Sequence, residues 1–217
     1  MKALSSSKIV IYYKQSSAGG HVSTAIIGEI NGEVVSFGAP VDMTGAVKSF
    51  SYGSLAVINS SKFIIDYCDS NGSKNSVIVG KVDGTTITKG SAYPYTSRMN
   101  YHNSATALND SKFVLAYSTI GPNNGFCIVG DINDTTVSWG DNYTFLSGQA
   151  AFYNSIQALD ENTFALAFQD LGNGYGTTVI GEVNGTDISY GDFQVIINAS
   201  VVDISLSKIK IKLFSNQ

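Results

Sequence analysis

The residues of this chain that could do chemistry are aromatic rings lying beside amide and carboxylate side chains. The rings fall in three short stretches, Tyr93-Pro94-Tyr95, Tyr101-His102-Asn103 and Phe152-Tyr153-Asn154. A ring offers a flat apolar plate to one face of a sugar, and neighbouring polar groups can bind the hydroxyls around the sugar's edge. This pattern predicts a ligand-binding site of the carbohydrate type.

Candidate polar partners lie in four irregular stretches that differ from one another in sequence: 15–21, 69–75, 119–125 and 170–176. Variable loops on a rigid scaffold are the usual place for binding residues. The full candidate set is Asp69, Asn71, Tyr93, Tyr95, Tyr101, His102, Asn123, Asn124, Phe152, Tyr153, Asp170, Asn173 and Tyr175. A purely structural interpretation stays open, since Asn, Asp and Gly also favour surface turns and the rings could pack between structural units.

Catalytic chemistry has little support in the sequence. Asp69 and Asp170 occupy equivalent positions about 100 residues apart, which places them too far from each other for a pair of catalytic carboxylates. No Ser-His-Asp or Cys-His arrangement can be argued, and no glycine-rich phosphate loop opens a helix. We therefore predict no catalytic residue and no cofactor, and we expect the chain not to be an enzyme.

Metal and disulfide chemistry are also not expected. His21 and His102 lie in different repeats, and Cys68 and Cys127 occupy non-equivalent repeat positions without a CxxC or Cys/His ligand spacing. We predict two unpaired, mostly buried thiols and no metal site.

Composition limits the remaining partners. The chain has 217 residues, is 43% hydrophobic and contains no apolar run of the roughly 20 residues that span a bilayer. A net charge of −4 and a pI near 5.0 disfavour nucleic acid, which requires a basic face. We see no cleavable signal peptide at the N-terminus. The compartment stays open, and the composition suits an extracellular or virion surface.

The chain is a repeat protein. Glycines at Gly28, Gly80, Gly130 and Gly181 are spaced by 52, 50 and 51 residues, and a second series follows at Gly38, Gly90, Gly140 and Gly191. Hairpin pairs recur with the same period at 31–32, 83–84, 133–134 and 184–185, mostly as Asn-Gly or Asp-Gly, which are typical of type I′ turns. Each unit reads as four strands. We divide the single domain, 1–217, into repeats of about 1–53, 54–103, 104–154 and 155–200, with a partial repeat at 201–217.

The strand patterns favour a β-propeller. Second strands such as Phe113–Tyr117 are apolar at nearly every position, so both of their faces must be covered, whereas fourth strands such as 136–139 alternate as an outer edge does. A sheet buried between two similar sheets is the blade of a propeller. The predicted fold is therefore all-β, a propeller of four four-stranded antiparallel blades plus a C-terminal half unit, or alternatively five blades.

Units built on ALNDSKFVLAY…G…IVGDINDT resemble, over essentially the whole chain, the repeats of lectin-like and other extracellular bacterial propellers. The resemblance is architectural. The WD dipeptide, the kelch double glycine, the sialidase Asp-box and the integrin-type calcium loop are not found, so no functional residue is carried over from a family.

The blade pattern places the variable loops and the blade-to-blade links at one end of the propeller, and we expect the site there. The tail alternates lysine with apolar residues over 208–214, which is typical of a protected edge strand and also offers a surface for self-association. Our leading hypothesis is a recognition module for glycans or another surface ligand. The alternative is a structural or self-assembling subunit of a virion, appendage or surface layer, with a protein surface as partner.

Overall fold

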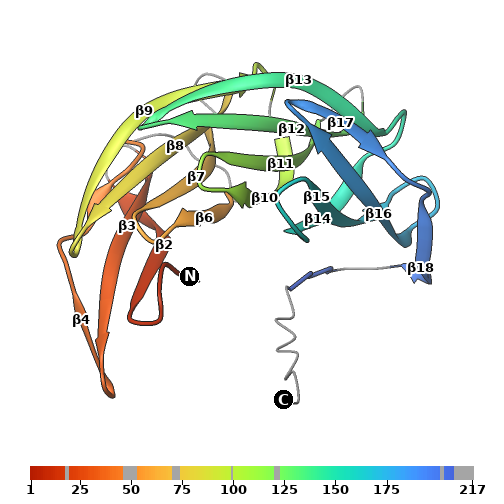
Figure 1. Ribbon diagram of the computed structural model, residues 1–217. Coiled ribbons are helices and arrows are strands. Elements are labelled where there is room, and N and C mark those ends of the chain that lie inside the picture. Colours follow the sequence, from red (N-terminus) through yellow and green to blue (C-terminus); the bar gives the residue numbers. More distant parts are fainter. Residues whose placement is uncertain are drawn as a thin grey trace, which may run out of the picture.

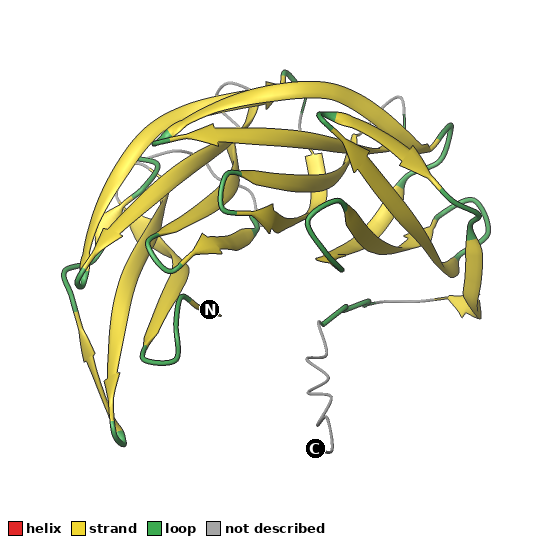
Figure 2. Ribbon diagram, viewed as in Figure 1, coloured by secondary structure: helices red, strands yellow, loops and turns green. Residues whose placement is uncertain are grey.

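The computed structural model describes residues 1–17, 20–45, 53–69, 74–98, 100–119, 123–200 and 203–207. Every regular element in these ranges is a β-strand (Figure 2). The strands form four antiparallel sheets arranged side by side along an arc, with the first sheet at one end and the fourth at the other (Figure 1). Within the described ranges no helix is long and apolar enough to cross a membrane.

Each sheet is one blade, and its strands follow one another in chain order. Blade 1 contains β1 (Lys2–Ala3), β2 (Lys8–Ser17), β3 (Gly20–Asn31), β4 (Val34–Phe37) and β5 (Val41–Asp42). Blade 2 contains β6 (Leu55–Asn59), β7 (Lys62–Asp69), β8 (Lys74–Asp83) and β9 (Thr86–Thr96). Blade 3 contains β10 (Asn100–Asn109), β11 (Lys112–Thr119), β12 (Asn124–Asn133) and β13 (Thr136–Leu146). Blade 4 contains β14 (Ala151–Ala158), β15 (Thr163–Asp170), β16 (Tyr175–Asn184), β17 (Asp187–Tyr190) and β18 (Gln194–Ser200).

The predicted all-β propeller architecture of four four-stranded units is confirmed. A partial fifth unit begins at 203–207, while the tail strand predicted at 208–214 lies outside the described residues. One boundary prediction was wrong: in blades 2 and 3 the outer strand continues past Gly90 and Gly140. Its second half pairs again with the third strand after a β-bulge. Tyr93-Pro94-Tyr95 therefore belongs to strand β9 and not to a link.

Blade-on-blade packing explains why the second strands are apolar throughout. Successive side chains of a strand point to opposite faces of its sheet. In β11, Phe113, Leu115 and Tyr117 pack against blade 2, whereas Val114 and Ala116 pack against blade 4. All five are buried. A polar residue in such a strand would lack water on either side, which is why the pattern does not alternate.

The inner strands are linked by a ladder of serine hydroxyls. The backbone N–H of Ala105 donates to Ser54 Oγ (2.9 Å), and that of Ile156 donates to Ser104 Oγ (3.2 Å). Leu206 N–H repeats the contact with Ser155 Oγ (2.8 Å). Residue 206 thus takes the position that the first strand of a fifth blade would occupy, and each serine satisfies a backbone donor that no neighbouring strand pairs.

The hairpins between third and fourth strands differ from the predicted type I′ turns. Asn31 pairs with Val34, so the two loop residues are Gly32 and Glu33, and only Gly32 has a positive φ (62°). Asp134 adopts the same conformation (φ 55°) in blade 3. A positive φ at the first loop position alone matches the type II′ pattern.

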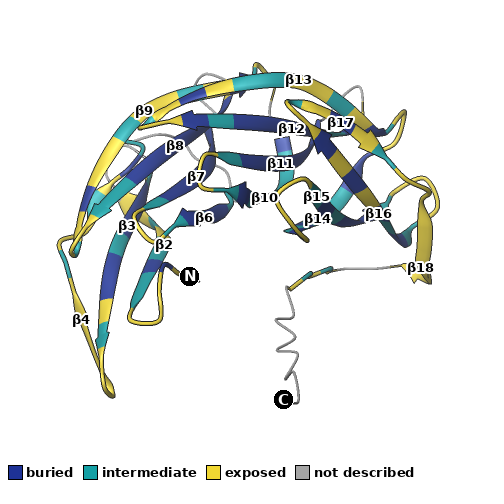
Figure 3. Cartoon of the chain, in the orientation of Figure 1, coloured by how far each residue is buried: buried dark blue, intermediate teal, exposed yellow. Residues whose placement is uncertain are grey.

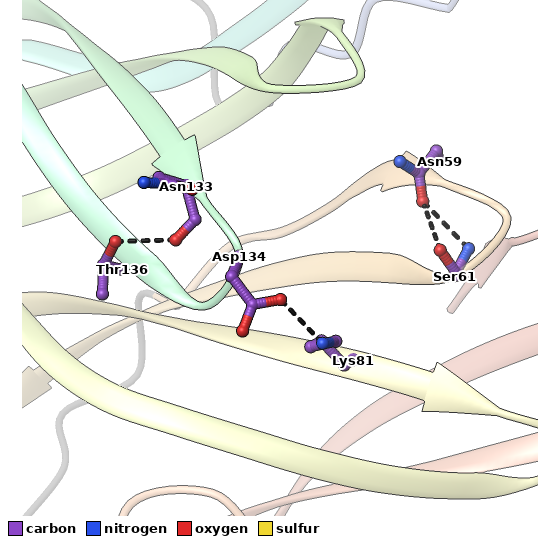
Figure 4. Close-up of polar contacts among 6 residues, drawn as sticks. All are labelled: Asn59, Ser61, Lys81, Asn133, Asp134 and Thr136. Carbon is purple, nitrogen blue, oxygen red and sulfur yellow. Dashed lines mark hydrogen bonds and ion pairs between the residues drawn. The ribbon is translucent and has the colours of Figure 1, made fainter.

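Turn side chains also join neighbouring blades. In Figure 4, Asn59 Oδ1 accepts hydrogen bonds from the backbone and hydroxyl of Ser61, which holds the tight turn between β6 and β7. In the same view Lys81 of blade 2 reaches Asp134 in the hairpin of blade 3 at 2.6 Å. That hydrogen bond lowers the pKa of Asp134.

Glycines in the third strands make room for the aromatic residue of the second strand. A Cβ placed on Gly130 would lie 2.3 Å from the buried ring of Phe113, and Gly80 and Gly181 face Phe63 and Phe164 in the same way. The first member of the series, Gly28, faces Ile9 at 3.0 Å. The repeating glycine is therefore a packing requirement.

Gly130→Ala should lower the free energy of unfolding by roughly 1–3 kcal/mol, because the buried Phe113 ring cannot move aside without disturbing two blades. Urea unfolding followed by tryptophan fluorescence measures this loss. Gly28→Ala is the matched control and should cost less, since Ile9 and its neighbours are only partly buried. Equal losses for both variants would contradict the packing argument.

Candidate functional site

Four of the sequence-predicted rings form a cluster where inner strands β10 and β14 begin. The ring of His102 lies 4.5 Å from that of Phe152 and 4.7 Å from that of Tyr153, measured between centroids. Phe152 and Tyr153 meet edge to face at 6.2 Å, and Tyr101 lies 6.5 Å from His102. All four rings are half-buried. The cluster therefore keeps ring surface in contact with solvent.

The backbone of the cluster is unusual. His102 and Tyr153 have φ values of 54° and 53°, in the left-handed region that residues other than Gly adopt infrequently and that His, Asn and Asp adopt more often than Tyr. Both lie in β-bulges, where the register shifts between Tyr101 and Ser104 in blade 3 and between Phe152 and Ser155 in blade 4. Such bulges re-aim side chains at the rim of a sheet, and backbone strain of this kind is commonly found at functional sites.

A pocket of about 250 Å³ opens beside the cluster. Its lining consists of Gly53, His102, Asn103, Tyr153, Asn154, Asp203 and Ile204. A second pocket of about 390 Å³ lies between the inner strands and shares Gly53 and Asn103 with the first. The two form one polar depression along the inner strands, with the aromatic cluster at its side.

Asn103 connects the pocket to a buried acid. Its amide donates to Asp66 Oδ2 (2.7 Å) and to the Tyr95 hydroxyl (3.1 Å), and that hydroxyl donates to Asp66 Oδ1 (2.8 Å). Asp66 is fully buried in β7. Burial raises the pKa of Asp66 to about 7, although the hydrogen bonds from Asn103 and Tyr95 act in the opposite direction. Burial likewise raises the pKa of Tyr95.

The pocket wall has hydrogen-bonding capacity to spare. Asn154, the repeat equivalent of Asn103, donates to Ser118 Oγ (3.3 Å) and to the carbonyl of Ala151 (3.5 Å). In the described part of the chain the Oδ1 atoms of Asn103 and Asn154 are buried without a hydrogen-bond partner. Buried amide oxygens normally have one, so these two oxygens keep acceptor capacity that the described residues do not use. Burial also lowers the pKa of His102, which favours its neutral form.

The other predicted residues lie outside this cluster. Tyr95 is buried between blades 2 and 3, so its ring supports the site without reaching the surface, and Tyr93 packs against the same core. Asn123 is exposed, and Asn124 accepts a hydrogen bond from the Gly148 backbone. Asp69 ends strand β7, and Asn71 lies outside the described residues.

Asp170, Asn173 and Tyr175 form a self-contained turn between β15 and β16. Asp170 accepts hydrogen bonds from Gly172 N and Asn173 Nδ2, and Asn173 accepts one from Tyr175 N. These contacts are what turn geometry by itself requires. Because Ala151 pairs with Asp170, the turn lies at the same end of blade 4 as the aromatic cluster.

Six residues at or behind the pocket were not in the predicted set: Gly53, Asn103, Asn154, Asp203, Ile204 and Asp66. Two signals could have found some of them. Asn103 and Asn154 each follow a predicted ring residue and are one repeat apart, 51 residues. Asp66 is an acid in a strand whose equivalents in blades 3 and 4 are Ala116 and Ala167.

Cys68 and Cys127 are both buried, and neither forms a disulfide bond with a described residue, as expected from the sequence. Burial raises the pKa of Cys127 to about 12, so this thiol stays protonated at neutral pH. Among the described residues no group of three or more His, Cys, Asp and Glu side chains could hold a metal ion.

The arrangement of blades defines the chain as a β-propeller. No protein-family model matches it, and no curated protein is similar in sequence. A crystal structure of the K499G mutant of NanB sialidase from Streptococcus pneumoniae has a similar fold, with a TM-score of 0.50 and 18% identity. The match covers 77% of this chain and 26% of that one, so this chain spans about a quarter of the sialidase's length. A structure described as NanB plus Optactamide matches over the same shares at 18% identity, with a TM-score of 0.49.

The comparison corrects one prediction. From the sequence we expected the chain not to be an enzyme, and that expectation was wrong: a solved structure with this arrangement of blades belongs to a sialidase, which is an enzyme. The propeller architecture and the lack of a familiar motif do not exclude catalysis. At 18% identity the similarity shows the fold alone.

Asp66 should make stability depend on pH. Its pKa in the folded chain (about 7) exceeds the ordinary value of 3.8, so the folded state binds more protons than the unfolded state between these limits. The free energy of unfolding should therefore fall as the pH rises from about 4 to about 7. Thermal unfolding across this range measures the decline.

Asp66→Asn is the matched variant, because it keeps the acceptor for Tyr95 and can donate to Asn103 Oδ1 once that amide rotates. In this variant the fall in the free energy of unfolding that Asp66 causes between about pH 4 and about pH 7 should disappear. Parallel curves for the two proteins would show that Asp66 does not titrate in this interval.

Proposed function

We propose that this chain binds carbohydrate in the pocket lined by His102, Asn103, Tyr153 and Asn154. The single observation that carries the proposal is the pair of left-handed bulges that places half-buried rings beside amides with spare acceptor capacity. Rings stack on the apolar face of a sugar, and amides bind its hydroxyls in the plane of the ring. The sialidase neighbour acts on sugars by its name, but the proposal depends on the residues of this chain.

The charges around the pocket favour a neutral sugar. Asp203 is the charged residue among those that line the smaller pocket, and Lys2 is the cation among those that line the larger one. A carboxylate-bearing sugar would need a cation close by, and a bidentate arginine is the usual partner. The chain has a single arginine, Arg98, which lines neither pocket. Asp203 would instead accept hydrogen bonds from hydroxyls.

The two rings have distinct roles in this proposal. Tyr153 offers ring surface and a phenolic hydroxyl at the pocket wall, while His102, whose pKa is lowered by burial, packs against Tyr153 and Phe152. A neutral imidazole can both donate and accept a hydrogen bond. The strained backbone fixes the direction of both side chains before the ligand arrives, which reduces the entropy lost on binding.

Replacing the ring residues should abolish binding on a glycan array. Tyr153→Gly and His102→Gly are preferable to alanine variants, because glycine adopts a positive φ without strain and the backbone should keep its conformation. We expect each variant to lose about tenfold or more in affinity for any neutral glycan that the wild type binds, since stacking and hydrogen bonds are both lost. Their thermal stability should stay close to that of the wild type.

Tyr143→Ala serves as the control, because Tyr143 lies on outer strand β13, where its hydroxyl contacts Asp187. This variant should bind as the wild type does. The proposal fails if the wild type binds no neutral glycan, or if Tyr143→Ala loses as much affinity as Tyr153→Gly.

A further inference from the structure

Among the described residues, none covers the outward face of blade 1. In the register of the fourth strands, Val35 is equivalent to Ile87, Val137 and Ile188 of the following blades. Each of those three residues is buried against the preceding blade. Those three are at most 7% exposed, whereas Val35 is 40% exposed. Phe37 and Tyr13 of the same face are exposed too. Strand β4 is exposed over its whole length (Figure 3).

On blade 4, the described residues leave the opposite outward face largely uncovered, apart from Leu206 at its inner edge. Ile180 occupies the position of Ile27, Val79 and Val129, which pack against the following blade and are fully buried. Ile180 is 47% exposed. Ile196 lies in the bulge of β18 and is equivalent to Tyr95 in the bulge of β9. Ile196 is exposed, and Figure 3 shows β18 exposed throughout.

Blade 4 also has a glycine, Gly191, that lacks the close contact which its equivalents make with the next blade. At each internal junction the glycine that follows or lies within the outer strand packs closely against a threonine in the hairpin of the next blade. The pairs are Gly38 with Thr85, Gly90 with Thr135 and Gly140 with Thr186. Gly191 keeps this position in blade 4, but the nearest atom to a Cβ placed on it would be the carbonyl oxygen of Ile180 in its own blade, at 3.7 Å. The hairpin residue of blade 1 at the threonine position is Glu33.

We propose that a second copy of this chain docks head to tail, with its blade 1 face (Ile9, Ile11, Tyr13, Val35, Phe37) against the blade 4 face (Ile180, Ile196, Gly191) of the first. The contact continues the blade-on-blade interface that already joins blades 1 to 2, 2 to 3 and 3 to 4. Leu206 holds the position that the first strand of the docked blade would take, so docking requires residues 203–207 to leave Ser155. Every copy has one face of each kind, at opposite ends of the arc (Figure 1). Two arcs can therefore cover each other, and an interface of this type makes either a closed ring or a chain of copies.

Charge at the edge of this contact makes it weaker than the internal junctions. Lys81 of blade 2 reaches the hairpin of blade 3 at Asp134 (Figure 4), and Glu182 holds the equivalent position in blade 4. Docking brings Glu182 of one copy to the Gly32–Glu33 hairpin of the other. Two glutamates then lie near each other, so association should strengthen as the salt concentration is raised.

Sedimentation of the wild-type chain over a range of concentrations tests the contact. We expect reversible association from the 23.0 kDa monomer to a dimer or a longer chain. Val35→Asp and Ile180→Asp should each weaken association about tenfold or more, because each buries an unpaired charge in the contact. Both positions are exposed in the single chain, so both variants should fold.

Val34→Asp is the matched control. Val34 neighbours Val35 but points to the other face, and its equivalents Thr86, Thr136 and Asp187 are exposed in every blade. This variant should associate as the wild type does. A wild type that stays monomeric at all concentrations would overturn the proposal, as would equal weakening by all three variants.

A charge exchange tests the direction of docking. Gly32 holds the position of Asp134 in the hairpin of blade 1, and Glu33 is the next residue. Glu182→Lys should tighten association about fivefold by placing a cation beside this Glu33 carboxylate. Glu33→Lys should do the same, and the double variant Glu33→Lys/Glu182→Lys should return to the affinity of the wild type. Additive tightening in the double variant would show that the two residues do not meet, and head-to-tail docking would be wrong.

Discussion

Apolar packing between the second and third strands of neighbouring blades is the interaction on which the rest of this structure depends. Side chains of β11 alternate between blade 2 and blade 4, so the strand is stable only when both neighbours are present. The glycines opposite Phe63, Phe113 and Phe164 follow from the same demand, since those rings fill the space between blades. The serine hydroxyls of the inner strands then satisfy backbone donors that this radial arrangement leaves without a strand partner.

The candidate site depends on the first strands of blades 3 and 4, β10 and β14, each of which has a β-bulge near its start. Where β10 and β14 begin, a bulge holds His102 and Tyr153 in the left-handed region, and the following residues Asn103 and Asn154 line the pocket. Asn103 is in turn held by Asp66 and Tyr95, which lie between blades 2 and 3. The pocket wall and the blade interface thus share side chains. A change in blade packing would therefore alter the position of the Asn103 amide in the pocket wall.

The sequence predicted the four units, the buried second strands and the end of the propeller at which the rings gather, because each depends on local periodicity. It misplaced Tyr95, whose strand was expected to end near Gly90, since the bulge that lets β9 continue is a pairing with β8 and not a local preference. It also assigned type I′ hairpins from Asn-Gly pairs, whereas pairing of Asn31 with Val34 shifts the loop by one residue. Asn103 and Asn154 were missed because an asparagine that binds and one that turns the chain look alike in sequence.

What the sequence by itself determined is the repeat of about 51 residues and the alternation within each strand, because side-chain spacing along a strand follows from backbone geometry. Only the tertiary structure decided which rings meet, which acid is buried, and which apolar side chains on the outward faces of blades 1 and 4 are exposed. Those outcomes depend on contacts between residues far apart in the chain, such as Asp66 with the residues that follow blade 2 or Ser104 with Ile156. Distances of this kind are set by how the sheets pack against one another, which no single stretch of chain encodes.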